Sequence, residues 1–530
     1  MFQKVKLLFF ELVTYGIGDV ATSLIGFLLL YVFTRILSTA DYGVLYLLLT
    51  VELIAKLIFR WGIDAAFMRL YYDCHDEPAR QRLASTVFFF LLAVNGGILA
   101  IALALAPFVA GQLFGTGRHT LALQFVLANT FVGSFYFIPF HVLRIQGKAV
   151  QFSVLTFSRS IGTILFRVLL VAGAGMGVLG MVLADVCVTL LLVPILVRLF
   201  VPLIRLTFSW NVLREALRFG LPRVPHGVAQ QVAGPTTDAM LLRLLLREPV
   251  AVAESQIGLY GNGASFGLII KLFLSAFEYA WAPFIFSTMK EPDARRTFSV
   301  VTTYGIAIMV LLAAGLSAVG RDLIRLMTPA GFHDGARVVP WIAVGASLQG
   351  VYLLTSIGLA IEKRTEYYPL STGLAAAANI GANILLIPRF GYIAAAWSNV
   401  VSYAVLATAA WLCSRRFYPI RYEWGRIVRV LAAGVIAYAI PTAFVPRMHP
   451  LLGLLLRGSL VAAAFPALLA LSGFFRAGEL ARLGELLSRI RPRSTPPPSS
   501  VLGLSTAPIT VPVQAVAAEE AEIAQIETDD

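Results

Sequence analysis

The sequence predicts an all-α polytopic membrane protein with about fourteen transmembrane helices, arranged as two six-helix lobes around a central cleft plus two C-terminal helices. Of the 530 residues, 58% are hydrophobic and only 13% are charged, and the mean hydropathy is +0.80. Apolar runs of about 20 residues, the length that spans a bilayer as a helix, recur along the chain. This composition excludes a soluble globular enzyme.

Each predicted span is an apolar run that ends at charged residues, glycine or proline. The N-terminal stretch has lysines before a leucine-phenylalanine run, but Glu11 interrupts the run, so we interpret it as an uncleaved first segment. In chain order the spans are 14–36, 42–63, 83–105, 120–143, 150–172, 177–200, 220–246, 256–286, 298–320, 337–361, 366–387, 391–413, 427–446 and 451–475.

These spans divide the chain into six predicted regions. A weak internal repeat supports two equivalent lobes, although three identities can also arise by chance: at an offset of 215 residues, Gly43 matches Gly258, Lys56 matches Lys271 and Ala65 matches Ala280. The regions are an N-terminal six-helix lobe (1–200), a cytoplasmic amphipathic linker (201–219), a C-terminal six-helix lobe (220–413), two appended transmembrane helices (414–475), an amphipathic segment (476–493) and a disordered tail (494–530).

The net charge of +13 reflects topology more than ligand binding. The loops on the side of the bundle that carries the termini contain far more Lys and Arg than the loops on the other side. This bias predicts that both termini are cytoplasmic. Because the basic residues are distributed in this way, we expect no nucleic-acid partner. The three cysteines, Cys74, Cys187 and Cys413, lie far apart and show no metal-ligand spacing, so neither a metal site nor a disulfide framework is expected.

Ionisable residues inside the predicted spans indicate an internal cavity, because a charge at the bilayer centre costs at least ~2.5 kcal/mol unless it is paired or hydrated. They gather on five spans and often share a helical face, at spacings of three, four or eight. The groups are Asp19 with Ser23; Glu52, Lys56 and Arg60; Arg159, Thr163 and Arg167; Arg223, His226, Gln230 and Asp238; and Lys271, Ser275 and Glu278.

Two other interpretations stay open for these charges. Glu52 and Lys56 are also correctly spaced for a structural ion pair. Arg60, Arg167, Arg223 and Arg243 stand near span ends, where long side chains extend to the membrane surface. A lumen with more bases than acids suggests an anionic substrate, because ammonium and guanidinium groups hold phosphate through charge-assisted hydrogen bonds.

Several stretches resemble the Wzx-type flippases, the polysaccharide-exporter branch of the multidrug/oligosaccharidyl-lipid/polysaccharide (MOP) superfamily. The resemblance covers about residues 10–475. One departure is Asp238-Ala239, where family members often have Asp-Arg. The stretches that carry it are LREALRFGLPRVPHGVAQQVAGPTTDAMLLRLLL (213–246), IGLYGNGASFGLIIKLFLSAFEYAWAPFIF (257–286), RILSTADYGVLYLLLTVELIAKLIFRWGIDAAFMRLYYD (35–73) and FGYIAAAWSNVVSYAV (390–405).

The resemblance implies a transporter, not an enzyme, that moves lipid-linked oligosaccharide or polysaccharide precursors such as O-antigen across the bacterial inner membrane by alternating access. The expected partners are a polyprenyl-pyrophosphate-linked glycan, membrane lipids and other glycan-assembly membrane proteins. No cofactor is expected, and the expected coupling ion is H+ or Na+. The alternatives are a lipid II flippase or a cation-coupled drug exporter of the same superfamily, and a membrane glycosyltransferase or polymerase, which would need larger outer loops.

Within that framework we assign two predicted roles. Substrate binding is assigned to cations and aromatic residues, and coupling to acids, with no catalytic residue and no metal ligand. The substrate-binding candidates are Lys56, Arg60, Arg159, Lys271, Arg223, Tyr279 and Trp281, and the coupling-ion candidates are Asp19, Glu52, Asp238 and Glu278.

Overall fold

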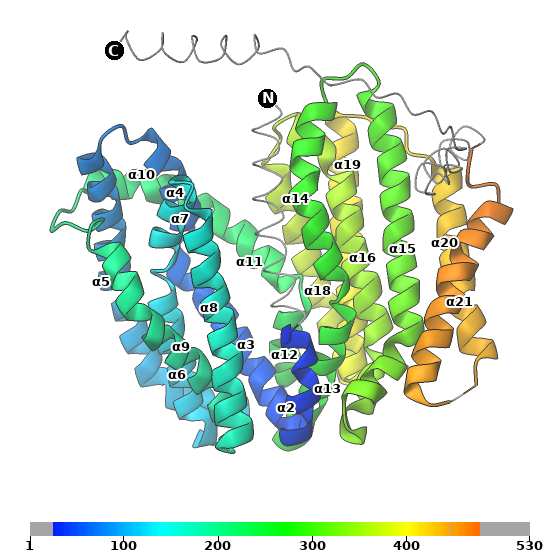
Figure 1. The fold of residues 1–530 in the computed structure, drawn as a ribbon, viewed down its shortest axis with the longest axis horizontal. Coiled ribbons are helices and arrows are strands. Elements are labelled where there is room, and N and C mark those ends of the chain that lie inside the picture. Colours follow the sequence, from blue (N-terminus) through cyan, green and yellow to red (C-terminus); the bar gives the residue numbers. More distant parts are fainter. Residues whose placement is uncertain (1–24, 447, 477–530) are drawn as a thin grey trace, which may run out of the picture. The chain divides into compact units, whose positions relative to one another are not determined.

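The computed structural model describes residues 25–446 and 448–476, and within these ranges the chain is helical and contains no strand (Figure 1). The predicted all-α polytopic fold class is therefore confirmed. Eleven helices in this part of the chain are long and apolar enough to cross a membrane, or twelve if one bent pair counts as a single span. The predicted number of fourteen spans is not confirmed.

We describe the helices in two groups that follow chain order, and α3 of the first group packs against α13 of the second. Helices α20 and α21 pack against α15 of the second group and against each other. The first group contains α2 (Leu30–Ile36), α3 (Thr39–Arg60), α4 (Ile63–Asp73), α5 (Glu77–Phe114), α6 (Thr120–Gly133), α7 (Phe137–Ile145), α8 (Ala149–Arg167), α9 (Gly177–Phe200) and α10 (Trp210–Gly220). The second contains α11 (Val224–Val232), α12 (Pro235–Leu245), α13 (Val250–Gly267), α14 (Ile270–Thr288), α15 (Ala294–Met327), α16 (Val339–Thr355), α17 (Ile357–Ile361), α18 (Tyr367–Phe390) and α19 (Tyr392–Phe417), followed by α20 (Trp424–Phe444) and α21 (Pro450–Leu471).

The two groups meet where α3 packs along α13. A Cβ atom at Gly43 would lie 1.8 Å from the carbonyl oxygen of Glu254, and one at Gly258 would lie 1.8 Å from that of Thr39. Only glycine permits so close an approach of two backbones. The two contacts are equivalent under the offset of 215 residues, which supports the internal repeat.

Helix α3 begins and ends at residues suited to those positions. The Ser38 side chain and Asp41 form a reciprocal capping box at its N-terminus. At its C-terminus Trp61 and Gly62 both adopt positive φ, which separates α3 from α4. The side chain of Asn95 on α5 forms two hydrogen bonds to residues at this break. Its amide donates to the Phe59 carbonyl at 2.8 Å, and its oxygen accepts from the Trp61 indole N–H at 2.9 Å.

Two predicted continuous spans are broken. Span 220–246 is divided into α11 and α12 by Gly234 and by Pro235, which occupies the start of α12 because proline lacks the amide hydrogen that a helix interior needs. Span 256–286 is divided into α13 and α14 with a bend of 49°. The other eleven predicted spans from 42–63 onward each coincide with one of the long apolar helices.

Four predicted segments fall wholly or partly outside the described residues: the uncleaved first segment, the first half of span 14–36, the segment 476–493 and the tail 494–530. Asp19 and Ser23 lie outside the described residues as well. One expectation needs correction. Helix α15 extends to Met327, beyond the predicted end of the ninth span at residue 320, and buries Asp322. The predicted boundary at residue 320 was too early because the charged pair Arg321-Asp322 interrupts the apolar run.

Candidate functional site

A pocket of about 150 Å³ lies between α3, α6 and α8 and is lined mainly by polar and charged side chains. Helix α3 contributes Glu52, Lys56 and Arg60, which share one face because they are four residues apart. Helix α8 contributes Arg159. The structure thus brings four of the predicted site residues together, and we call this the α3–α6–α8 pocket.

Three cations and one acid line this pocket, so its charge is positive. The Lys56 ammonium lies 2.5 Å from a carboxylate oxygen of Glu52, with side chains 44% and 25% exposed. Arg60 lies 3.8 Å from Asp64, one turn further along. The Arg159 guanidinium stands 5.3 Å from the centre of the Tyr136 ring and makes no ion pair with any described residue. Arg159 therefore keeps a charge that is not neutralised by a neighbour.

The C-terminal end of α6 supplies the uncharged part of the lining, which the sequence analysis missed. Its residues are Asn129, Thr130, Gly133 and Ser134. Within the described part of the chain, the buried side-chain oxygen of Asn129 has no hydrogen-bond partner, and a Cβ at Gly133 would meet no atom within 4 Å. Gly133 therefore leaves space open. The only signal in the sequence is a short run of polar and small residues within an apolar span.

Asp238 occupies a second, separate position, in the first turn of α12. Its side chain is 0% exposed and forms no ion pair with a described residue. Instead its oxygens accept hydrogen bonds from the Tyr260 hydroxyl at 2.6 Å and from the Asn383 amide at 3.0 Å. Asn379 and Asn399 also lie beside this carboxyl group. A buried carboxylate surrounded only by neutral groups is costly unless it binds a proton or a cation.

The surroundings of Asp238 offer oxygen atoms that are not otherwise used. The side-chain oxygens of Asn383 and Asn399 are buried and accept no hydrogen bond from any residue that the structure describes. Carboxylate and amide oxygens are ligands typical of hard cations. No group of three or more His, Cys, Asp or Glu side chains occurs in the described residues, so this set differs from a transition-metal site.

The candidates on α14 do not join the α3–α6–α8 pocket. Lys271 is the second residue of α14, directly after the break from α13, and not deep within a continuous span as expected. Glu278 is exposed, and Tyr279 lies on the same helix. Trp281 is only 4% exposed and stacks on Phe284 at 5.5 Å, so in this conformation its ring faces protein.

The last two candidates lie elsewhere. Arg223 ends the short helical turn before α11 and is exposed, with its guanidinium 4.3 Å from the Phe219 ring centre. Asp19 is outside the described residues. Arg167, which shares a predicted face with Arg159, pairs instead with Asp185 of α9 at 3.0 Å. That ion pair gives Arg167 a structural role between neighbouring helices.

The helices and the charged pocket define a multi-pass membrane protein of the transporter class. The model of a family described as "Polysaccharide biosynthesis protein" matches residues 32–327, more than half of the chain. The chain belongs to this family. A comparison with curated proteins found no match.

Solved structures show which fold this is. The chain is similar to "Lipid II flippase MurJ, inward closed conformation", with a TM-score of 0.67 and 13% identity over 89% of this chain and 98% of that one. It is also similar to "Inward-facing conformation of a multidrug resistance MATE family transporter of the MOP superfamily", with a TM-score of 0.51 and 16% identity over 78% and 94% of the two chains. The fold is that of MOP superfamily transporters.

Proposed function

We propose that this protein is a flippase that moves lipid-linked oligosaccharide or polysaccharide precursors across the bacterial cytoplasmic membrane by alternating access. The observation that carries the proposal is the α3–α6–α8 pocket, where Lys56, Arg60 and Arg159 surround a space between membrane helices. Cations within membrane-spanning helices are tolerated chiefly where they are paired or functional, and Arg159 has no acidic partner among the described residues.

The pocket suits the charged part of such a substrate. Its volume of about 150 Å³ is smaller than the roughly 300–1,000 Å³ of sites for drug-sized ligands. It therefore accommodates the pyrophosphate, while the polyprenyl tail stays in the bilayer and the sugars extend from the pocket. Guanidinium and ammonium groups hold phosphate oxygens through charge-assisted hydrogen bonds.

Glu52 has a role that follows from its contact with Lys56. Its carboxylate lies 2.5 Å from the ammonium and neutralises it. When a pyrophosphate enters, Lys56 can exchange one anionic partner for another. The exchange lowers the cost of leaving a cation within the membrane between transport cycles.

We place the coupling ion, H+ or Na+, at Asp238. Of the described candidates it is the acid that is fully buried and has no cationic partner, and amide oxygens stand beside it. The Asp238→Asn variant keeps the shape and removes the charge, so transport should lose its response to an imposed proton or sodium gradient. A gradient response equal to that of wild type would contradict this assignment.

The remaining features of the proposal concern the cell. The basic loops favour cytoplasmic positions for both termini, and we propose that the membrane is the bacterial inner membrane. The partners are a polyprenyl-pyrophosphate-linked glycan, membrane lipids and other membrane proteins of glycan assembly. We propose no enzymatic activity, because the chemistry that the pocket supports is binding and release.

Export in cells tests the proposal with a matched pair of variants. Arg159→Ala should reduce surface glycan about 10- to 100-fold, since a hydrogen bond to a charged group contributes about 1.5–3 kcal/mol. Arg198→Ala removes the same charge from an exposed position on α9 outside the pocket and should leave export unchanged. Equal export by the two variants, at equal protein levels, would contradict the proposal.

The same variants separate the rival functions. A cation-coupled drug exporter should have a lumen richer in acids than in bases, which the α3–α6–α8 pocket is not. If Arg159→Ala changed resistance to cationic drugs and left glycan export intact, the drug exporter would be favoured. If Arg159→Ala instead reduced the transport of cell-wall precursors, a lipid II flippase would be favoured.

A further inference from the structure

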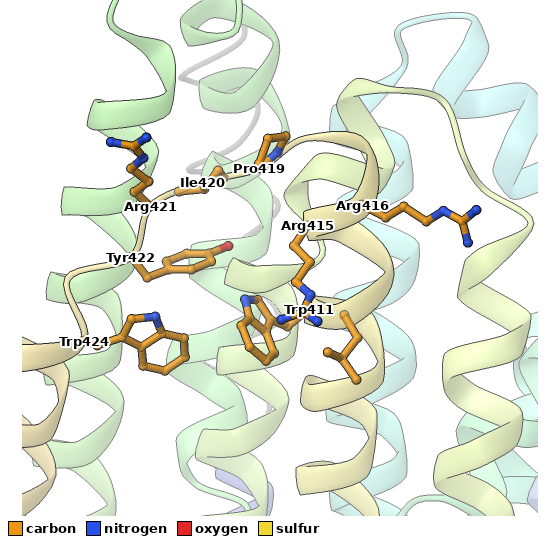
Figure 2. A pocket seen from close by; sticks show the side chains of 9 residues that line it. Trp411, Arg415, Arg416, Pro419, Ile420, Arg421, Tyr422 and Trp424 are labelled. Carbon is orange, nitrogen blue, oxygen red and sulfur yellow. The ribbon is translucent and has the colours of Figure 1, made fainter.

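A second pocket, of about 850 Å³, lies where α19 ends and α20 begins, and we call it the α19–α20 pocket. Its charged lining consists of Arg415 and Arg416 in the last turn of α19 and Arg421 in the connection to α20 (Figure 2). All three arginines are exposed, and none forms an ion pair with a described residue. It shares no residue with the α3–α6–α8 pocket.

Aromatic side chains form one wall of this pocket. The Arg415 guanidinium lies 4.8 Å from the centre of the Trp411 ring, in cation–π contact. Trp424 meets Trp411 edge to face at 5.4 Å, and Tyr422 meets Trp424 at 6.2 Å. Figure 2 shows these rings beside Arg415, while Arg416 and Arg421 extend to other sides of the pocket. The positive charge is thus spread around the opening.

The connection that carries these residues is held in place. The Ser299 hydroxyl of α15 donates a hydrogen bond to the Arg421 carbonyl at 2.6 Å, and Tyr418 and Ile420 are each 8% exposed. Burial raises the pKa of Tyr422 to about 12, so its hydroxyl remains protonated and can donate a hydrogen bond. The nearby acid, Glu423, is engaged with Arg426 at 2.8 Å and does not line the pocket.

The position of the pocket indicates what it binds. Both flanking helices are long and apolar enough to span a membrane, so the connection between them lies at the membrane surface. Trp and Tyr concentrate at that level, where one part of the ring is in apolar surroundings and another is hydrated. Basic pockets between membrane helices on the cytoplasmic side recognise the phosphates of anionic lipids.

We propose that the α19–α20 pocket binds the headgroup of an anionic phospholipid. Arg415 and the Tyr422 hydroxyl contact its phosphate, Trp411 and Trp424 pack beside its glycerol and upper acyl chains, and Arg416 and Arg421 add positive charge at the rim. Such a lipid stabilises the junction between the second group of helices and α20. The site is independent of the substrate pocket and of the proposed transport function.

The test compares lipids on the purified full chain. Phosphatidylglycerol, added to the protein in detergent, should remain bound in native mass spectrometry and raise the melting temperature by several degrees. Phosphatidylcholine and inorganic phosphate should do neither. The Arg415→Gln/Arg421→Gln variant should lose both effects, and Arg214→Gln/Arg218→Gln, which removes the same charge from α10, should keep them.

A second variant distinguishes a loss of lipid binding from a folding defect. Arg416→Gln/Arg421→Gln leaves the contact of Arg415 with Trp411 intact and should weaken phosphatidylglycerol retention several-fold. Retention equal to wild type in both pocket variants would overturn the proposal. So would an equal effect of phosphatidylcholine, which would indicate general lipid solvation, or of inorganic phosphate, which would indicate a soluble anion.

Discussion

Lys56 has two interpretations that differ in a measurable way, because it lies 2.5 Å from Glu52 and also lines the α3–α6–α8 pocket. If it binds pyrophosphate, Lys56→Ala should reduce glycan export about 10- to 100-fold at a normal protein level. Lys56→Arg should retain part of the activity, because the charge survives in a different geometry. Surface glycan and membrane protein level are measured together.

The double variant Glu52→Gln/Lys56→Ala separates the two interpretations. If Lys56 only neutralises Glu52, removing both charges should restore export, because no unpaired acid remains. If Lys56 binds substrate, the double variant should be as defective as Lys56→Ala. Full export in the double variant would exclude a phosphate-binding role for Lys56.

Helical spacing was the part of the site that the sequence could predict. Glu52, Lys56 and Arg60 had to share a face of α3 once the span was recognised. The contribution of α6 could not be predicted, because Asn129 and Ser134 acquire their role only when α6 packs beside α3. Burial of Trp281 against Phe284 likewise depends on tertiary packing, which spacing along one helix does not report.

At the scale of elements, the contact of α3 with α13 must open if the two groups of helices move apart during transport. The hydroxyl oxygens of Thr39 and Ser255 lie 2.7 Å apart at this contact. In a variant that lacks Cys74, Cys187 and Cys413, the pair Thr39→Cys/Ser255→Cys should cross-link under oxidation and stop export. A reducing agent should restore it.

Single cysteine variants at these two positions serve as controls and should export normally under oxidation. Separation of α3 from α13 would be unnecessary for transport if the cross-linked protein remained fully active. The extent of cross-linking on a denaturing gel must accompany the activity, so that incomplete oxidation is not mistaken for activity of the cross-linked form.

The contact of α21 with α15 depends on a buried ion pair between Arg457 and Asp322, which are 9% and 2% exposed. Arg457 also donates to the carbonyl oxygens of Val445 and Pro446 at 3.1 and 3.2 Å. Asp322→Ala leaves this arginine without its carboxylate and should cost about 3–5 kcal/mol of stability. Thermal unfolding of the purified protein in detergent measures the loss.

Asp322→Ala/Arg457→Leu should recover much of that stability, because the uncompensated charge is removed. A melting temperature of Asp322→Ala equal to that of wild type would show that the pair does not join α15 to α21. A substitution at Gly453 could not replace the lost contact without a clash, since a Cβ there would lie 2.8 Å from the Asp322 carboxylate oxygen.

Helix positions were predictable from apolar runs, whereas breaks within them were not. The run at 256–286 stays apolar across its break, so hydropathy alone indicates one span there. Pro235 is visible in the sequence, but proline in a membrane helix can also be accommodated by a kink. The bend between α13 and α14 contains no proline that the sequence could have flagged, and α13 ends at Gly267.

At the scale of the whole molecule, the distribution of Lys and Arg predicts the orientation in the membrane. In a variant without native cysteines, single cysteines near Arg80, Arg295 and Arg415 should resist an impermeant thiol reagent applied from outside. Cysteines near Arg118 and Arg389 should react. The reverse labelling pattern would overturn the orientation.

The general architecture could be predicted because hydropathy and charge bias act over hundreds of residues. The meeting of α3 and α13 at Gly43 and Gly258 could be suspected only from the weak repeat, since a glycine in an apolar span does not identify its contact. The neutral hydrogen-bond partners of Asp238 could not be predicted either, because α13 and α18 supply them from distant parts of the chain.

Translocation by the purified protein tests the central claim most directly. Proteoliposomes carry a fluorescent polyprenyl-pyrophosphate oligosaccharide, and a membrane-impermeant reductant reports how much of the label has reached the outer leaflet. Wild type and Arg198→Ala should move the labelled lipid, and Arg159→Ala should move it at least about tenfold more slowly. Movement at the same rate in all three, or at the rate of protein-free vesicles in all three, would contradict a flippase that acts through the α3–α6–α8 pocket.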